Sequence, residues 1–239
     1  LITTGGKSYP VTGSSGDGYK WLEAMGHTVV DPHPALTPLL IKESWIKELE
    51  GLSLKNVAIN IYQNNKKIDS RFGEALFTGD GMSGPIILDM SKQIGLALKN
   101  APVQLAIDFK PKLDFKTLDQ RIQNDFAKSN NKLFRNSLGE LLPKKLIPII
   151  IKLSEIEPDK KANAITKEER KRLLHLLKNF ELNIKSLYGF DKAIVTAGGV
   201  LLKEVDPKTM QSKIINNLYL AGEILDLDGP TGGYNLQAC

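Results

Sequence analysis

Apolar and polar residues alternate along much of the first half of the chain. Val57, Ile59 and Ile61 are each separated by one small or polar residue, which is the pattern of a β-strand with one buried face. Asn64 and Asn65 follow, and such a pair between two apolar runs is typical of a hairpin turn. Several short strands joined by close turns predict a small barrel or sandwich.

The hydrophobic period changes from two to 3.6 residues after residue 110. Leu118, Ile122 and Phe126 recur at every fourth position, so they share one face of a helix. Further on, Thr166 and Glu169 match a capping box, in which the two side chains satisfy backbone N–H groups at the start of a helix. This part of the chain predicts a helical subdomain. The apolar stripe of the second helix is predicted to consist of Leu173, Leu177 and Phe180.

The two ends of the chain share a third pattern, a short apolar strand that runs into a glycine-rich loop. Residues 1–4 precede Gly5 and Gly6, and residues 217–221 precede Gly222. Similar ends around a different middle indicate one discontinuous domain with inserts, because insertions are tolerated where chain ends lie close together. The predicted domains are a discontinuous domain over residues 1–30 and 206–239, a β-rich insert over 31–110 and 190–205, and a helical subdomain over 111–189.

The composition predicts a globular protein of the cytoplasm. Hydrophobic residues make up 41% and charged residues 25% of the chain, which are ordinary values. No apolar run approaches the roughly 18–20 residues that span a bilayer, so we expect no membrane association. One cysteine, Cys239, excludes an internal disulfide and suits a reducing compartment. The three histidines are scattered, and no metal site is predicted.

Positive charge is concentrated in the helical part of the chain. Residues 111–190 hold 17 of the 32 Lys and Arg residues but 10 of the 27 Asp and Glu residues, while the whole chain has a net charge of +5. Such an asymmetry can mark a surface that meets nucleic acid or acidic ligands. Lysine-rich helices exposed to water show the same pattern, and both interpretations stay open.

The most informative chemistry lies in the last twenty residues. A strand that ends in Ala221 and Gly222 lets a ligand approach the backbone without a Cβ in the way. Glu223 directly beyond it can accept a hydrogen bond from a sugar-type hydroxyl. Gly232 and Gly233 expose backbone N–H groups at a predicted helix start, where a carbonyl or an anion is favoured. A flavin needs these groups, but a glycine-rich turn with capping acids would have the same residues.

The last segment is similar to the second FAD motif of flavoproteins that bind two dinucleotides. More narrowly, the chain resembles the bacterial aminoacetone-oxidase-type family of NAD(P)/FAD-dependent oxidoreductases. Four stretches spread over the whole chain carry this resemblance, and together they are specific where each alone would be weak. They are residues 4–10 with 12–19, residues 76–78 with 83–85, residues 195–200 with 204–213, and residues 221–237.

The resemblance implies an α+β fold in which a Rossmann-like FAD-binding domain is interrupted by a β-barrel-like insert with a helical subdomain. It also implies FAD as the cofactor and NADH or NADPH as a candidate electron donor. In flavoenzymes the cofactor carries the hydride chemistry and the protein supplies orientation, and no catalytic residue can be assigned. The implied flavin neighbours are Thr4, Gly5, Gly6, Gly222, Glu223, Asp228, Gly232, Gly233, Tyr234, Asn235 and Leu236.

Two departures from the family pattern matter. The G-x-G-x-x-G fingerprint after a first strand is absent, so we expect a fragment that lacks the N-terminal FAD fingerprint and the C-terminal end. Such a fragment is expected to bind FAD weakly and to be inactive alone. In addition, Thr78 is followed by Gly79 and Asp80, where many members of the family place a His and an aromatic residue.

The sequence thus predicts part of a cytoplasmic, bacterial FAD-dependent oxidoreductase that transfers hydride. Its substrate is expected to be a small molecule or RNA, and no oligomeric state is predicted. The alternative interpretation treats the insert domains as an RNA- or protein-binding module that presents a macromolecular substrate to the flavin.

Overall fold

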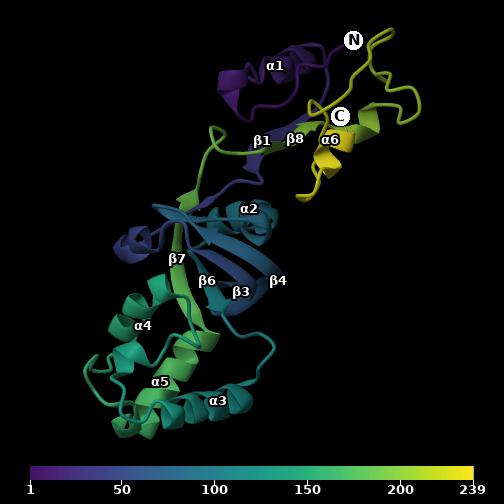
Figure 1. Ribbon diagram of the computed structural model, residues 1–239. Helices are drawn as coiled ribbons and strands as arrows, with labels where there is room; N and C mark the ends of the chain where they lie inside the picture. The colour runs from purple at the N-terminus through teal and green to yellow at the C-terminus, as the bar shows by residue number, and fades with distance from the viewer. Residues whose placement is uncertain (239) are drawn as a thin grey trace. The chain divides into compact units, whose positions relative to one another are not determined.

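The computed structural model describes residues 1–238 (Figure 1). Internal contacts divide the chain into two compact units. The barrel unit comprises Ile41–Met82 and Ala101–Lys185, and the flanking unit comprises Leu1–Leu40, Ser83–Asn100 and Ser186–Cys239. The finer division into three parts that the sequence suggests stays a prediction.

A closed barrel of six strands is the main β structure, and it confirms the predicted α+β fold with a barrel. Around the barrel the strands are β2 (Leu39–Ile41), β5 (Gly81–Ser83), β4 (Lys66–Phe77), β3 (Ser53–Gln63), β6 (Val103–Asp108) and β7 (Phe180–Leu187). β3 pairs antiparallel with both β4 and β6, and Ile59 lies opposite Arg71 on one side and Ile107 on the other.

The alternation in β3 buries one face of the strand, as predicted. Val57, Ile59 and Ile61 have at most 2% of their surface exposed, and they fill the barrel interior. Asn64 and Asn65 have φ values of +50° and +60°. A two-residue hairpin turn of type I′ requires φ above zero at both positions, and asparagine tolerates it. This turn between β3 and β4 confirms the hairpin prediction.

The helical part of the barrel unit contains α3 (Phe115–Lys128), α4 (Ile147–Ser154) and α5 (Lys167–Lys178). Leu118, Ile122 and Phe126 are buried on α3, and the capping box of Thr166 and Glu169 begins α5. Both predictions are confirmed. The 3₁₀ turns of this unit are η2 (Ser44–Leu49), η3 (Phe134–Asn136), η4 (Lys144–Leu146) and η5 (Ala162–Ala164), while η1 (Pro10–Thr12) and η6 (Leu202–Glu204) belong to the flanking unit.

The predicted apolar stripe of α5 is wrong at its end. Leu173 and Leu177 are buried on the helix, but the helix stops at Lys178 and Phe180 opens β7. The centre of the Phe180 ring lies 5.3 Å from the centre of the Phe109 ring and 5.7 Å from the centre of the Trp45 ring. These aromatic contacts belong to the barrel core, and they place Phe180 in the sheet.

The flanking unit contains α1 (Asp17–Ala24), β1 (Val29–Ala35), α2 (Pro85–Leu98), β8 (Val195–Val200) and α6 (Tyr234–Ala238). β1 and β8 form an antiparallel pair. The strands predicted over residues 1–4 and 217–221 are not regular strands, since Ile2 and Leu220 share only an isolated parallel bridge. Leu220 is nevertheless fully buried in a cluster with Leu22 and Ile224.

α2 was missed in the sequence, where residues 31–110 were expected to be β-rich. Its buried residues are Ile86, Ile87, Met90, Ser91, Ile94 and Ala97, which follow the period of a helix. Pro85 at the first position of the helix was a further local signal, because its fixed φ suits a helix start.

Candidate functional site

The first and last glycine loops of the chain meet at the start of β8. A Cβ on Gly6 would lie 2.5 Å from Thr196 Oγ1 and 2.8 Å from Glu223 Cδ, so only glycine fits at position 6. Thr196 Oγ1 accepts hydrogen bonds from the backbone N–H groups of Lys7 at 2.8 Å and Ser8 at 3.0 Å. The Thr196 N–H in turn donates to the carboxylate of Glu223. These contacts, which we call the loop junction, join Gly6, Lys7 and Ser8 to Thr196 and Glu223, which lie more than 180 positions further along the chain.

A cavity of about 150 Å³ opens beside the loop junction, and its lining is mostly apolar. Gly222 has a φ of +84°, and a Cβ at that position would have no atom within 4 Å. The backbone is therefore open to a ligand on this side. The cavity is lined by Ile194, Val195, Gly222, Glu223, Leu227, Asn235, Leu236 and Ala238.

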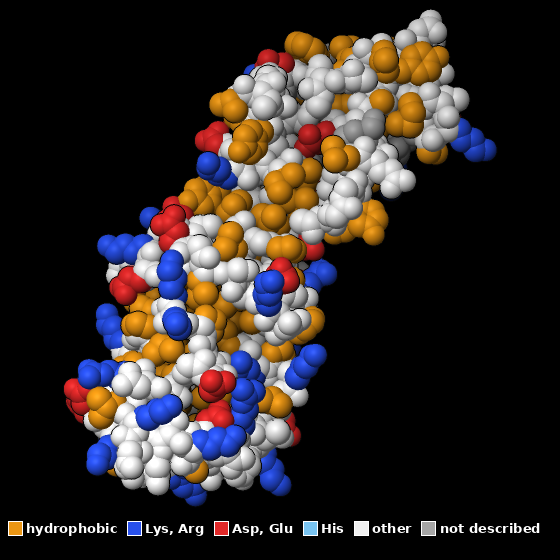
Figure 2. Space-filling view, in the orientation of Figure 1, with side chains coloured by type: hydrophobic (Ala, Val, Ile, Leu, Met, Phe, Trp, Pro, Cys, Tyr) orange, Lys and Arg blue, Asp and Glu red, His pale blue; other side chains and the backbone are white. Residues whose placement is uncertain are grey.

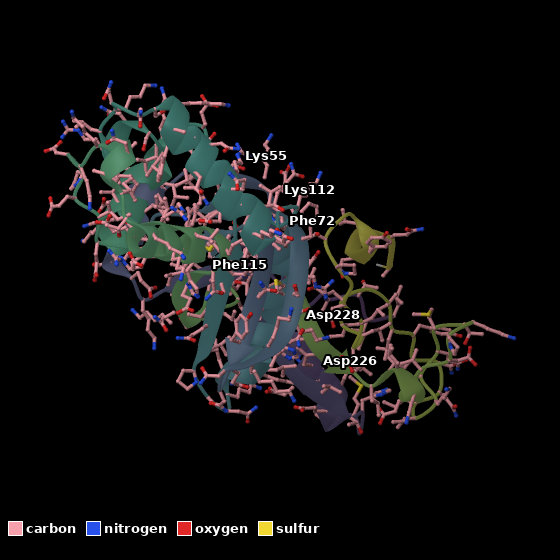
Figure 3. All side chains as sticks on the ribbon, turned by 90° about the horizontal axis from the view of Figure 1, so that it is seen from below. Lys55, Phe72, Lys112, Phe115, Asp226 and Asp228 are labelled. Atoms are coloured by element: carbon pink, nitrogen blue, oxygen red, sulfur yellow. The ribbon has the colours of Figure 1, made fainter. Side chains whose placement is uncertain are left out.

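The loop that covers this cavity is stabilised from α2. Lys92 Nζ donates to Asp228 Oδ1 at 2.6 Å, and the Thr231 N–H donates to Asp89 Oδ1 at 2.7 Å. Within the loop, the side-chain amide of Asn235 accepts from the Gly229 N–H at 2.7 Å and donates to the Gly229 carbonyl at 2.9 Å. Asp226 and Asp228, labelled in Figure 3, belong to the segment that enters this loop.

The sequence missed Asp89 and Lys92, because α2 lies far from the loop along the chain. Once α2 is known, a Lys and an Asp one turn apart on one face are the signal for such a contact.

The structure brings together only some of the predicted flavin neighbours. Gly6, Gly222 and Glu223 surround the loop junction, while Asn235 and Leu236 line the cavity. Asp228 pairs with Lys92 beside the cavity-lining loop. The others lie near the two loops without lining the cavity: Thr4 and Gly5 before the junction, and the exposed Gly232, Gly233 and Tyr234 at the start of α6.

Tyr19 is a buried residue that contacts the last loop at Glu223. Its hydroxyl donates to the backbone carbonyl of Glu223 at 3.1 Å. Burial raises the pKa of Tyr19 strongly, and the carboxylates of Glu223 and Asp226 raise this pKa further. The phenol therefore stays protonated at neutral pH and serves as a hydrogen-bond donor that fixes the position of Glu223.

A second polar cluster in this unit has the hydrogen-bond arrangement of a Ser–His–Glu triad, but it stabilises the fold and is not a catalytic site. His27 Nδ1 lies 2.9 Å from Glu204 Oε2, and His27 Nε2 lies 2.9 Å from Ser212 Oγ. Ser212 Oγ also accepts from the N–H groups of Ile214 and Ile215. The His27 side chain is fully buried and Ser212 is buried as well, so no substrate can reach the hydroxyl. The cluster joins the end of α1 to the segment after η6.

Residues 1–238 contain neither a membrane-spanning helix nor a cluster of metal-ligating side chains. No helix there is both long and apolar enough to cross a bilayer. In the same residues, no group of three or more His, Cys, Asp and Glu side chains could hold a metal ion.

Comparison with known proteins places this architecture in a family. A model described as "HI0933-like protein barrel and H2TH domain" matches residues 33–195. The chain is 31% identical over 238 residues to a 3-dehydro-bile acid delta(4,6)-reductase of Clostridium scindens. It is also 31% identical, over 239 and 238 residues, to the ribosomal RNA dihydrouridine synthases of Haemophilus influenzae and Escherichia coli. Each match covers 99% of this chain and 56–58% of the relative.

The chain therefore belongs to the HI0933-like family, and it spans somewhat more than half the length of the curated relatives that it matches. The names of these relatives support enzymatic activity in the family. They do not establish the narrower resemblance to aminoacetone-oxidase-type proteins, which stays a prediction.

Proposed function

We propose that the protein containing this chain is a FAD-dependent oxidoreductase that takes electrons from NADH or NADPH. The observation that carries this proposal is the loop junction, where Gly6, Gly222 and Glu223 meet beside a cavity. Flavin, when bound, would supply the hydride chemistry, while the protein supplies orientation and electrostatics. Cytoplasmic localisation is part of the same proposal.

The residues around the cavity fit one end of a flavin. Apolar side chains such as Val195 and Leu227 match a ring system, and the bare backbone at Gly222 permits close approach. The carboxylate of Glu223, already oriented by Thr196, is a suitable acceptor for a hydroxyl. The cavity has room for about five water molecules at roughly 30 Å³ each. It would hold only part of FAD, so we expect the 239-residue chain alone to bind FAD weakly and to be inactive.

The reaction class we propose is the reduction of a carbon–carbon double bond conjugated to a carbonyl group. A delta(4,6)-reductase of a 3-dehydro compound and an enzyme that makes dihydrouridine both saturate such a bond, and this chain is about equally similar to both. Hydride would be added to the carbon distant from the carbonyl, and a proton to the adjacent carbon. The narrower aminoacetone-oxidase-type assignment would require oxidation of an amine, and nothing in the site favours it.

Two glycine variants test the flavin site. Gly222 and Gly26 both have positive φ, +84° and +99°, and a Cβ at either position would contact nothing within 4 Å. The backbone strain of Gly222→Ala and Gly26→Ala is therefore similar, on the order of 1 kcal/mol. We expect the whole protein to lose bound FAD in Gly222→Ala and to keep it in Gly26→Ala. Equal FAD content in the two variants would contradict the proposed site.

A second proposal concerns the substrate, and the charge distribution favours RNA. Lys and Arg side chains are frequent over the barrel unit on the face shown in Figure 2. This agrees with the excess of Lys and Arg over Asp and Glu in residues 111–190. Two of the relatives are named for ribosomal RNA. We propose that the barrel unit holds RNA and presents it to the flavin. Reduction of a uridine in transcribed ribosomal RNA by the whole protein would support this, and reduction of a steroid enone alone would exclude it.

A further inference from the structure

A cationic pocket lies on the barrel unit where β3, β6 and α3 come together. It has a volume of about 420 Å³. Lys55 reaches it from a bulge in β3, at which Asn56 adopts a φ of +55°. A bulge re-aims the neighbouring side chains. The residues that line the pocket are Lys55, Asn56, Phe109, Lys110, Pro111, Lys112, Leu113 and Arg121, and none of them is acidic.

The carboxylates beside this pocket already have hydrogen-bond or ion-pair partners within the protein. Asp108 accepts from Lys178 Nζ at 2.5 Å, and Asp114 accepts from the N–H of Thr117 as the N-cap of α3. Asp125 lies 3.7 Å from Arg121 and offsets part of that charge. The three lysines of the lining therefore give the pocket a positive potential. Consistent with this, burial and the neighbouring Arg121 lower the pKa of Lys110.

Two exposed aromatic rings flank the pocket. Phe72 and Phe115 are the exposed phenylalanines of residues 1–238, with 57% and 52% of their surface accessible. Phe72 on β4 lies opposite Ala58 on β3, which lies opposite Asp108 on β6. Lys178 bonds to Asp108 and sits 5.9 Å from the centre of the Phe115 ring.

Phe72 and Asp108 thus lie in one row across neighbouring strands of the barrel, and Phe115 at the start of α3 lies near the Asp108 end of this row. Figure 3 labels Lys55, Lys112, Phe72 and Phe115 on this unit. Neighbouring strands are about 4.8 Å apart, so Phe72 and Asp108 are roughly 10 Å from each other. A few nucleotides of a single strand can span such a distance.

We propose that this surface binds single-stranded RNA, with backbone phosphates in the pocket of Lys55, Lys110 and Lys112 and bases stacked on Phe72 and Phe115. A positively charged groove combined with aromatic platforms is how proteins hold single strands without reading a sequence. The inference rests on the RNA substrate proposed above, and it adds the place and the mode of binding. A duplex would not use the rings, because its bases are already stacked on one another.

The test is the binding of a fluorescently labelled 12-nucleotide oligouridine to the purified protein, measured by anisotropy at several salt concentrations. The test variant is Lys55→Ala/Lys112→Ala. The control is Lys66→Ala/Lys67→Ala, which removes the same charge from exposed residues at the hairpin end of β4. Along β3 that end is about 25 Å from Lys55, at about 3.3 Å per residue.

We expect the test variant to lower the slope of log affinity against log salt by about 1.4, since each phosphate contact of a single strand contributes about 0.7. The control should retain the slope. Phe115→Ala should weaken binding about tenfold, within the range for loss of one stacked base, and should leave the slope unchanged.

Three results would overturn the inference: equal losses in the two lysine variants, no effect of Phe115→Ala, or equally tight binding of duplex RNA or polyglutamate. Binding is read without cofactor or turnover. A protein that does not bind oligouridine would therefore contradict the RNA inference and leave the flavin proposal standing. A colourless protein that binds oligouridine would contradict the flavin proposal and leave the RNA inference standing.

Discussion

The loop junction makes a quantitative prediction for Gly6→Ala. The added methyl group would lie 2.5 Å from Thr196 Oγ1 and 2.8 Å from Glu223 Cδ, distances that real Cβ atoms do not reach. Thr196 cannot move away easily, since it is fully buried and its hydroxyl accepts from two backbone N–H groups. Overpacking of this kind costs about 1–3 kcal/mol, and each lost hydrogen bond would add about 1 kcal/mol.

The assay is calorimetric unfolding, compared with Gly189→Ala as the control. Gly189 belongs to the same unit, has no positive φ, and a Cβ there would have nothing within 4 Å. For a chain of this size 1 kcal/mol corresponds to about 2–4 °C in Tm, so the overpacking alone should lower the Tm of Gly6→Ala by about 2–12 °C, and any lost hydrogen bond would lower it further. Equal Tm values for the two variants would refute the close contact between the first and last loops.

Three further predictions concern the barrel unit and the cavity-lining loop. Ile59→Ala should cost about 2–5 kcal/mol in denaturant unfolding, because Ile59 is fully buried inside the barrel. Unchanged stability would contradict that position. Lys92→Ala should weaken FAD binding to the whole protein by up to about fivefold, since a half-exposed ion pair with Asp228 contributes about 0.2–1 kcal/mol; a larger loss would require a direct contact with the cofactor. Asp119→Asn should lower the free energy of unfolding at pH 7 by about 0.2–1 kcal/mol, the contribution of a partly exposed ion pair. The hydrogen bond from Arg170 lowers the pKa of Asp119, so this stabilisation is present above the unfolded carboxyl pKa of about 3.9 and is lost as the pH falls through the lower folded pKa. A difference between variant and wild type that persists unchanged at pH 2 would contradict this assignment.

The parts of the fold that the sequence predicts correctly are those governed by local pattern. Alternation in β3, the hairpin at Asn64 and Asn65, and the capping box of α5 each depend on residues within a few positions of one another. The end of α5 was predicted wrongly because Phe180 continues the helical spacing by chance. Its aromatic partners, Phe109 and Trp45, come from distant parts of the chain.

The candidate site could be predicted as residue types but not as a geometry. Glycines and an acid at the two ends of the chain indicate a ligand, whereas the contact of Gly6 with Glu223 spans most of the chain and has no local signal. The helix α2 was hidden in a segment expected to be strands, and its Asp89 and Lys92 were missed with it. Whether Tyr234 and the exposed glycines at the start of α6 contact a flavin stays a prediction.

The most direct test of the central claim is the visible absorption spectrum of the whole protein, purified without added cofactor. The flavin proposal predicts the absorption bands of oxidised flavin, bleached when NADH or NADPH is added without oxygen. The nucleotide that bleaches them would identify the electron donor. A protein that is colourless as purified, and stays so after incubation with FAD and removal of the excess, would contradict the proposed function.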